Sequence, residues 1–270
     1  MAIEVRPTAS AGSGEKPRGR RRSRRLVPPQ AISVAGLVAL WWLASVGQPS
    51  HILPSPGAVA GKLWEIAFVT GELWAALQIS LVSLLLGGGL ALVVGVPLGV
   101  LMGAQRTIER SLDLYVIGLY VAPVSALTPL FIFWLGIDLA PRVATVFVFA
   151  VPQIIITCFR GARSTPLTHI QVARAFRATR RDIFTKVIVP HEIPYVVTAL
   201  RLGLGQAIKG MVLAELLIST TGLGLLLSTY SQLFDTAALI AVVLVLMLLG
   251  VLATAIVARL EKAITPWRPL

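Results

Sequence analysis

Residues 73–105 read LWAALQISLVSLLLGGGLALVVGVPLGVLMGAQ, a run of 33 residues without a charged side chain. A helix rises about 1.5 Å per residue, so roughly 20 apolar residues cross the hydrocarbon core of a bilayer and about 17 still suffice. Among the other charge-free stretches of 17 residues or more, four are read as spans: 31–47, 114–137, 143–159 and 236–258. A hydrophobic stretch near 195–217 carries Lys209 and Glu215 but is otherwise similar. These segments predict six membrane-spanning helices.

The composition points to the same class of protein. Hydrophobic residues make up 56% of the chain and charged residues 13%, with a mean hydropathy of +0.83. These values lie outside the range of soluble domains. Only helices and closed β-barrels span a bilayer, and the apolar runs lack the alternation of barrel strands. We therefore predict an all-α, polytopic membrane protein with six transmembrane helices.

The basic residues predict the orientation. With the N-terminus in the cytoplasm, 21 of the 24 Lys and Arg residues fall on the cytoplasmic side, as the positive-inside rule requires. Lys62 and Arg142 fall outside, and residues 216–234 are read as an external loop with a short helix. The predicted order is a disordered basic cytoplasmic tail (1–30), a first span (31–47), an external segment with an amphipathic helix (48–72), a core with five spans (73–260) and a cytoplasmic tail (261–270). The chain is therefore expected to be a multi-pass membrane protein with both termini in the cytoplasm. We expect the N-terminal tail to contact anionic lipid, and nothing else in the chain supports a nucleic-acid partner.

A basic segment separates the fourth and fifth spans. Residues 160–201 hold eight of the 24 Lys and Arg residues. Thr165-Pro166 reads as an N-cap followed by proline at the first helical position, and Thr179-x-x-Asp182 reads as a capping box that opens a second helix. Pro190 is expected to end that helix and Pro194 to begin the next span. The cytoplasmic loop 160–194 is thus predicted to be folded.

Three glycines, Gly95, Gly99 and Gly103, share one face of the second span. Small residues at this spacing let helix backbones approach closely, more often within one chain than between subunits. Pro97, in the same span, is expected to bend it, as are Pro123 and Pro129 in the third span and Pro152 in the fourth.

The sequence contains no recognisable motif for catalysis or for binding a cofactor or metal. Cys158 is the single cysteine, the three histidines are scattered, and there is no phosphate-binding Gly-x-x-x-x-Gly-Lys-Ser/Thr loop. The protein is therefore not expected to be an enzyme, and its energy must come from a partner or a gradient. Polar residues at membrane depth are candidates for a translocation path: Ser83, Ser125, Gln153, Gln206, Lys209 and Glu215. For the serines a hydrogen bond within their own helix is the competing interpretation. Lys209 could face another helix, a second subunit or an anionic solute.

Several segments, in order, resemble the permeases of bacterial ABC importers of the nitrate, sulfonate and taurine type. They are LPSPGAVAGKLWE, GVPLGVLMG, PVSALTPLFIFWLGI, VFAVPQIIIT, QVARAFRATRRDIFTKVIVPHEIPYVVTALRLGLG, MVLAEL and STTGLGLLL. The resemblance covers about residues 53–260. It implies a type I importer bundle in which two permease chains, as a homodimer, enclose the path of a small solute. It also implies a location in the bacterial inner membrane, a solute-binding protein outside and two copies of an ATPase subunit in the cytoplasm.

The resemblance further implies that the basic segment is the loop that couples the permease to its ATPase. The residues concerned are Gln171, Val172, Ala173, Arg174, Phe176, Arg177, Thr179 and Pro190. Gln171 stands where the family has Glu and Arg177 where it usually has Gly, so an altered partner surface is possible. The competing interpretation of this loop is a basic amphipathic segment on anionic lipid. The competing interpretation of the whole chain is a gradient-driven secondary transporter, which would more often show internal repeats and ionisable relays.

Overall fold

In the computed structural model, residues 29–49, 52–218 and 221–264 are described. This part of the chain is helical and contains no strand. The elements are α1 (Pro29–Ser45), α2 (Pro56–Trp64), η1 (Glu65–Val69), α3 (Glu72–Ala104), α4 (Arg106–Val121), α5 (Val124–Leu135), α6 (Leu139–Arg163), α7 (Leu167–Ala175), α8 (Arg180–Ile183), η2 (Phe184–Ile188), α9 (Val189–Ile218), α10 (Leu223–Gln232) and α11 (Thr236–Ile264). The predicted tails fall mainly outside the described residues.

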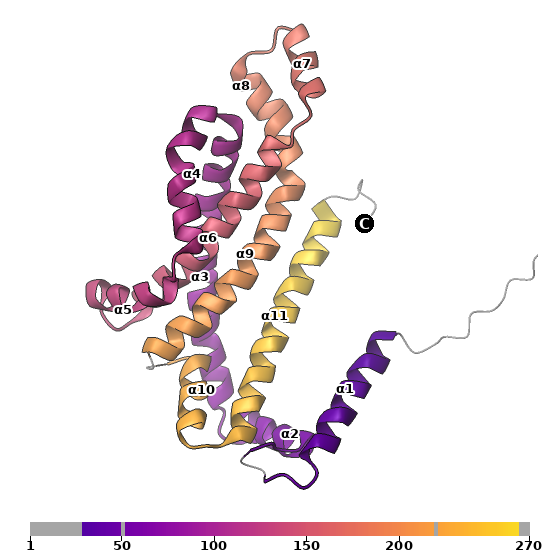
Figure 1. The fold of residues 1–270 in the computed structure, drawn as a ribbon, viewed down its shortest axis with the longest axis vertical. Helices are drawn as coiled ribbons and strands as arrows, with labels where there is room; N and C mark the ends of the chain where they lie inside the picture. The colour runs from indigo at the N-terminus through magenta and orange to yellow at the C-terminus, as the bar shows by residue number, and fades with distance from the viewer. Residues whose placement is uncertain (1–28, 50–51, 219–220, 265–270) are drawn as a thin grey trace, which may run out of the picture.

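The all-α fold class is confirmed, and described helices occupy all six predicted regions, although fewer than six of them qualify as spans. Four helices are long and apolar enough to cross a bilayer, and α4 with α5 forms a fifth candidate that is bent by 96°. The helix α1 is shorter, and its described apolar part covers Ile32–Ser45. Figure 1 shows α3, α6, α9 and α11 running along the long axis, with α7 and α8 at one end and α2 and α10 at the other.

The third predicted span is not one helix. We expected a continuous span over 114–137 with a proline bend, whereas α4 already begins at Arg106 and a sharp break separates it from α5. Ala122 has an extended ψ of 140° and Pro123 caps α5. A residue before proline is forced out of the helical region, and proline has no N–H to donate, so the chain turns here. The hydropathy of the segment carries no information about this change of direction.

The core lies between α3, α6 and α9. A Cβ placed on Gly99 would lie 2.6 Å from the carbonyl oxygen of Ile155, and one on Gly103 would lie 2.5 Å from the Cβ of Ala162. The glycine face of α3 therefore packs against the backbone of α6 within the same chain, as predicted. Pro97 and Pro152 lie inside α3 and α6, which both remain unbroken.

The end of the bundle opposite α7 and α8 is closed by α2, η1 and α10. Ser55 caps α2 by accepting a hydrogen bond from the backbone N–H of Ala58 at 3.3 Å. The apolar stripe expected in residues 48–72 is buried through Val59 and Ile66. Ile66 belongs to a cluster with residues of α3, α10 and α11. The stripe thus packs on the bundle itself.

Candidate functional site

Three of the six polar residues proposed for a path make local contacts or none. Ser83 on α3 is buried and donates a hydrogen bond to the carbonyl oxygen of Ser80 at 2.9 Å, within its own helix. Gln153 on α6 is half-buried, and its amide donates to the Thr157 hydroxyl at 3.2 Å. Ser125 is exposed on α5. These three residues do not converge on one cavity.

Lys209 and Gln206 form a polar strip on α9. Residues three apart lie on the same face of a helix. Lys209 is exposed and Gln206 is half-buried, and Lys209 has no ion pair with a described residue. Lys209 lies nine residues before the end of α9, about 14 Å at 1.5 Å per residue. An ammonium group at that depth requires water, an anion or a covering chain.

Glu215 lies instead in a buried polar junction. Its side chain is 0% exposed, and its Oε2 accepts hydrogen bonds from the Ser80 hydroxyl at 2.8 Å and from the backbone N–H of Gly224 at 2.9 Å. The Ser80 hydroxyl in turn accepts from the backbone N–H of Leu223 at 2.9 Å. Gly222 has a φ of 91°, and a Cβ there would lie 2.5 Å from the Glu215 carboxyl carbon. These contacts pin the start of α10 to α3 and α9, which favours a structural role for Glu215.

Arg142 completes this junction, and the sequence reasoning missed it. The sequence analysis assigns Arg142 to the external side without a role, and the structure buries its side chain at the start of α6. Its Nη1 donates to the Thr221 hydroxyl at 2.6 Å and its Nε to the carbonyl oxygen of Asp138 at 3.2 Å. The sequence signal that could have indicated this role was an arginine in the first turn of an otherwise apolar helix.

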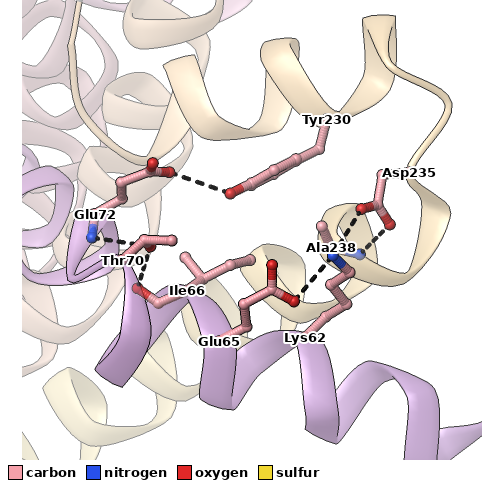
Figure 2. A network of polar contacts seen from close by, with 8 residues as sticks. All are labelled: Lys62, Glu65, Ile66, Thr70, Glu72, Tyr230, Asp235 and Ala238. Atoms are coloured by element: carbon pink, nitrogen blue, oxygen red, sulfur yellow. Dashed lines mark hydrogen bonds and ion pairs between the residues drawn. The ribbon is translucent and has the colours of Figure 1, made fainter.

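A second polar network joins α2 and η1 to α10 and α11 (Figure 2). Lys62 Nζ lies 3.0 Å from Glu65 and 3.6 Å from Asp235, and the Tyr230 hydroxyl donates to Glu72 at 3.3 Å. The hydrogen bond with Glu65, followed by the charge of Asp235, raises the pKa of Lys62. Burial and the nearby Glu72 carboxylate raise the pKa of Tyr230. A cavity of about 500 Å³ opens beside this network between α2 and the start of α11.

The other end of the molecule carries the α7–α8 segment, residues 164–189. The capping box is confirmed, because the Thr179 hydroxyl accepts from the backbone N–H of Asp182 at 3.2 Å and the Asp182 carboxylate accepts from that of Thr179 at 3.1 Å. The first cap was misassigned by one residue. Pro166, with an extended ψ of 129°, precedes α7, and the Thr165 hydroxyl donates back to Ala162 at 2.9 Å.

The prediction that Pro190 ends the second helix is wrong. The chain from Arg180 to Ile218 forms one helix of 39 residues in which α8, η2 and α9 are continuous. Within η2 the backbone N–H of Val189 reaches back five residues to Phe184. This π-helical turn shifts the hydrogen-bond register just before Pro190, whose missing N–H therefore does not interrupt the helix.

The residues singled out in this segment fall on and around α7. Gln171, Val172, Ala173 and Arg174 lie on α7, Phe176 and Arg177 follow it, Thr179 caps α8 and Pro190 lies in the first turn of α9. Ala173 is half-buried and the other seven are exposed. Arg177 has a φ of 58°. The backbone N–H of Arg177 donates to Arg174 and that of Ala178 donates to Ala173, at 2.9 and 3.0 Å. This is a Schellman motif with arginine at the left-handed position where glycine is usual.

Comparison with known proteins places the chain among transport permeases. Residues 95–266 match the profile of the family described as binding-protein-dependent transport system inner membrane component. The taurine transport system permease protein TauC of Escherichia coli is 29% identical over 242 residues, which is 87% of this chain and 88% of that protein. The nitrate import permease protein NrtB of Synechocystis is 28% identical over 96% of this chain and 98% of that protein. A solved structure of the MetNI methionine ABC transporter in an inward-facing conformation superimposes with a TM-score of 0.66 at 22% identity, over 73% of this chain and 98% of that chain.

Proposed function

The chain belongs to the binding-protein-dependent transport system inner membrane component family, and we propose that it is the permease subunit of an ATP-driven importer for a small anionic solute. The solute class we favour is a sulfonate, nitrate, taurine-like molecule or small organic acid. TauC and NrtB, which align along nearly the whole chain, are named for taurine and nitrate. ATP hydrolysis is assigned to a separate ATPase subunit, since the sequence has no phosphate-binding loop.

The observation that best supports an anionic solute is the exposed side chain of Lys209. It lies within the Arg180–Ile218 span on a face that the described chain leaves uncovered. A charge facing lipid at this depth would be costly, by estimates that begin at about 3 kcal/mol. A water-filled path between two copies of the chain would solvate the ammonium group and let it attract an anion. Gln206, on the same face, would add a hydrogen-bonding group to that path. Ser125 and Gln153 remain candidates on α5 and α6. Ser83 and Glu215 are the weakest, because Ser83 donates within its own helix and Glu215 is buried against Ser80 and Gly224.

The proposed assembly contains two permease copies, two ATPase subunits and one solute-binding protein. In it both termini and the α7–α8 segment face the cytoplasm, because this orientation keeps 21 of the 24 basic residues inside. The α7–α8 segment would then be the part that the ATPase subunits bind. The end formed by α2, η1 and α10 would face the binding protein.

In the proposed cycle the binding protein delivers the solute to the outer end of the path. Closure of the ATPase pair on ATP moves the two α7–α8 segments, and the bundles rock so that the path opens to one side at a time. Lys209 holds the anion by charge while the path is closed at both ends. Release follows when the path opens to the cytoplasm and water replaces the ammonium–anion contact.

Cysteine labelling tests the orientation. Arg180→Cys should be protected from a membrane-impermeant maleimide added outside intact cells, whereas Gly57→Cys should react. The native Cys158 is buried and gives a low background. Labelling of position 180 from outside would overturn the proposed orientation.

Transport in proteoliposomes tests the energy source. Uptake by the chain with its ATPase and binding protein should require ATP inside the cytoplasmic compartment and should survive collapse of the ion gradients by ionophores. Uptake that needs a gradient and no ATPase would establish the alternative, a secondary transporter.

A further inference from the structure

We propose that the outer face of α4 binds a phospholipid that has one negative charge and a headgroup with hydroxyl groups, the chemistry of phosphatidylglycerol. The headgroup would occupy a cavity of about 470 Å³ between α4 and the end of α6, which we call the α4 headgroup site. In the proposed orientation this site faces the cytoplasmic leaflet. Its polar lining consists of Arg106, Glu109, Arg110, Asp113 and Arg163.

One face of α4 carries two arginines above an apolar stripe. Arg106 and Arg110 lie one turn apart at the start of the helix, and Leu114, Ile117 and Val121 follow on the same face at spacings of three and four residues. These three apolar side chains are 77%, 48% and 74% exposed. The opposite side of α4 packs inward against α3 and α6 (Figure 1).

The length of this face suits a phospholipid. Val121 lies 11 residues beyond Arg110, about 16 Å along the helix. One leaflet contributes about 15 Å of hydrocarbon to the bilayer core. A lipid phosphate held at the arginines would therefore place its acyl chains along the exposed stripe.

The charges of the site favour a ligand with one negative charge. Arg163 is paired with Glu109, so this arginine and this carboxylate neutralise each other. Arg106, Arg110 and Asp113 form no ion pair with a described residue, and together they leave the site with a net charge of +1. A lipid whose only charge is its phosphodiester brings this sum to zero. The zwitterionic headgroup of phosphatidylethanolamine would leave it at +1.

Asp113 favours a headgroup with hydroxyl groups. It is half-buried in the lining of the cavity, one turn from Arg110, and an ionised carboxylate only accepts hydrogen bonds. A phosphate next to this carboxylate would be repelled, since both groups are negative. A glycerol headgroup separates the two functions, because its phosphodiester pairs with the arginines while a hydroxyl group donates to Asp113.

The apolar stripe distinguishes a lipid from a soluble anion. A free phosphate would contact the arginines and leave the exposed Leu114, Ile117 and Val121 without a ligand. A phospholipid uses both parts of the face, since its headgroup and its acyl chains are covalently joined. Basic residues next to an anionic leaflet are also attracted to it, which adds to the affinity.

The test is the lipid preference of the full chain, purified in detergent and titrated with single lipids in native mass spectrometry. The probes are the dioleoyl forms of phosphatidylglycerol, phosphatidylethanolamine and phosphatidylmethanol, the last of which has one negative charge and no hydroxyl group. The wild-type chain should bind phosphatidylglycerol at least about fivefold more tightly than either of the others. Arg106→Gln/Arg110→Gln should lower this affinity about tenfold or more, because each arginine near an anionic headgroup contributes about fivefold.

A second variant tests the role of the aspartate. Asp113→Ala removes the acceptor for the headgroup hydroxyl, so phosphatidylglycerol and phosphatidylmethanol should then bind equally well. A preference for phosphatidylglycerol that survives in Asp113→Ala would refute the hydroxyl contact.

A matched control is Arg180→Gln/Arg181→Gln on α8, which removes the same charge from exposed positions outside the cavity. It should keep the wild-type preference. Loss of the preference in this control, with normal binding by Arg106→Gln/Arg110→Gln, would assign the lipid to the α7–α8 segment and overturn the proposal.

Three other outcomes would also overturn it. The first is equal binding of phosphatidylglycerol and phosphatidylethanolamine by the wild-type chain. The second is competition by water-soluble glycerophosphoglycerol as strong as that by the lipid, which would indicate a site for a soluble anion. The third is loss of association between copies in Arg106→Gln/Arg110→Gln without any lipid, which would make this face a contact between two chains. None of these measurements involves ATP or the transported solute, so each of these results would leave the proposed function intact.

Discussion

Replacing Gly99 by alanine should destabilise the protein, whereas the same change at Gly89 on the same helix should not. A Cβ on Gly99 would lie 2.6 Å from the Ile155 carbonyl oxygen and 2.8 Å from the Cβ of Cys158, while one on Gly89 would have no atom within 4 Å. A backbone oxygen inside α6 cannot rotate away as a side chain can, so α3 and α6 must separate.

The difference in stability between Gly99→Ala and Gly89→Ala measures the cost of separating α3 from α6. Both replacements remove a glycine from a helix interior, which favours the helix by up to about 1 kcal/mol in each case. Inserting a methyl group into a closely packed core costs about 1–3 kcal/mol. The helix term cancels in the comparison, so Gly99→Ala should be less stable than Gly89→Ala by roughly 1–3 kcal/mol. At 2–4 °C per kcal/mol for domains of 150–250 residues, the apparent melting temperature should differ by about 2–12 °C.

Melting temperatures measured in detergent by fluorescence-detected size-exclusion chromatography would test the ranking. Gly95→Ala should fall between the two, because the nearest atom to its Cβ is the Ile154 side-chain Cγ2 at 2.9 Å, which can move. If Gly99→Ala and Gly89→Ala melt at the same temperature, α3 and α6 do not cross at the glycine face, and the reasoning is refuted.

Two further predictions concern the polar groups of α9. Ser80→Ala should leave Glu215 and the Leu223 N–H each short of a partner, at a cost of about 1–3 kcal/mol, and should release the start of α10 to limited proteolysis; unchanged cleavage would contradict the structural role of Glu215. Lys209→Met should abolish solute uptake with normal assembly, and Lys209→Arg should retain part of it; wild-type uptake by the Met variant at normal yield would show that the ammonium merely reaches to the membrane surface.

The sequence predicted what depends on local periodicity. The charge-free runs located the spanning helices, the spacing of Gly95, Gly99 and Gly103 predicted a close approach, and Thr179 with Asp182 predicted a capping box. Each of these features is determined by residues within a few positions of one another.

Long-range partners could not be obtained in this way. Ser80 and Glu215 are 135 residues apart, and Arg142 and Thr221 are 79 apart, so no spacing rule joins them. The break before α5 was missed for another reason. Hydropathy reports the length of an apolar run, but Pro123 sets its direction through backbone geometry.

The continuity of the helix through Pro190, where the sequence predicted an end, bears most directly on mechanism. A helix that ended at Pro190 would place a joint between the α7–α8 segment and the membrane span. The structure instead has one helix from Arg180 to Ile218, in which η2 absorbs the proline. Lys209 lies 29 residues beyond Arg180, about 44 Å along that helix. A continuous helix has no loop at which its two parts could move independently, so in the proposed cycle a displacement of the α7–α8 segment by the ATPase would be passed to Lys209 along one continuous rod. The same rod carries Glu215, which holds α10. One helix could therefore couple the proposed ATPase-binding end, the proposed anion-binding Lys209 and the opposite end of the bundle.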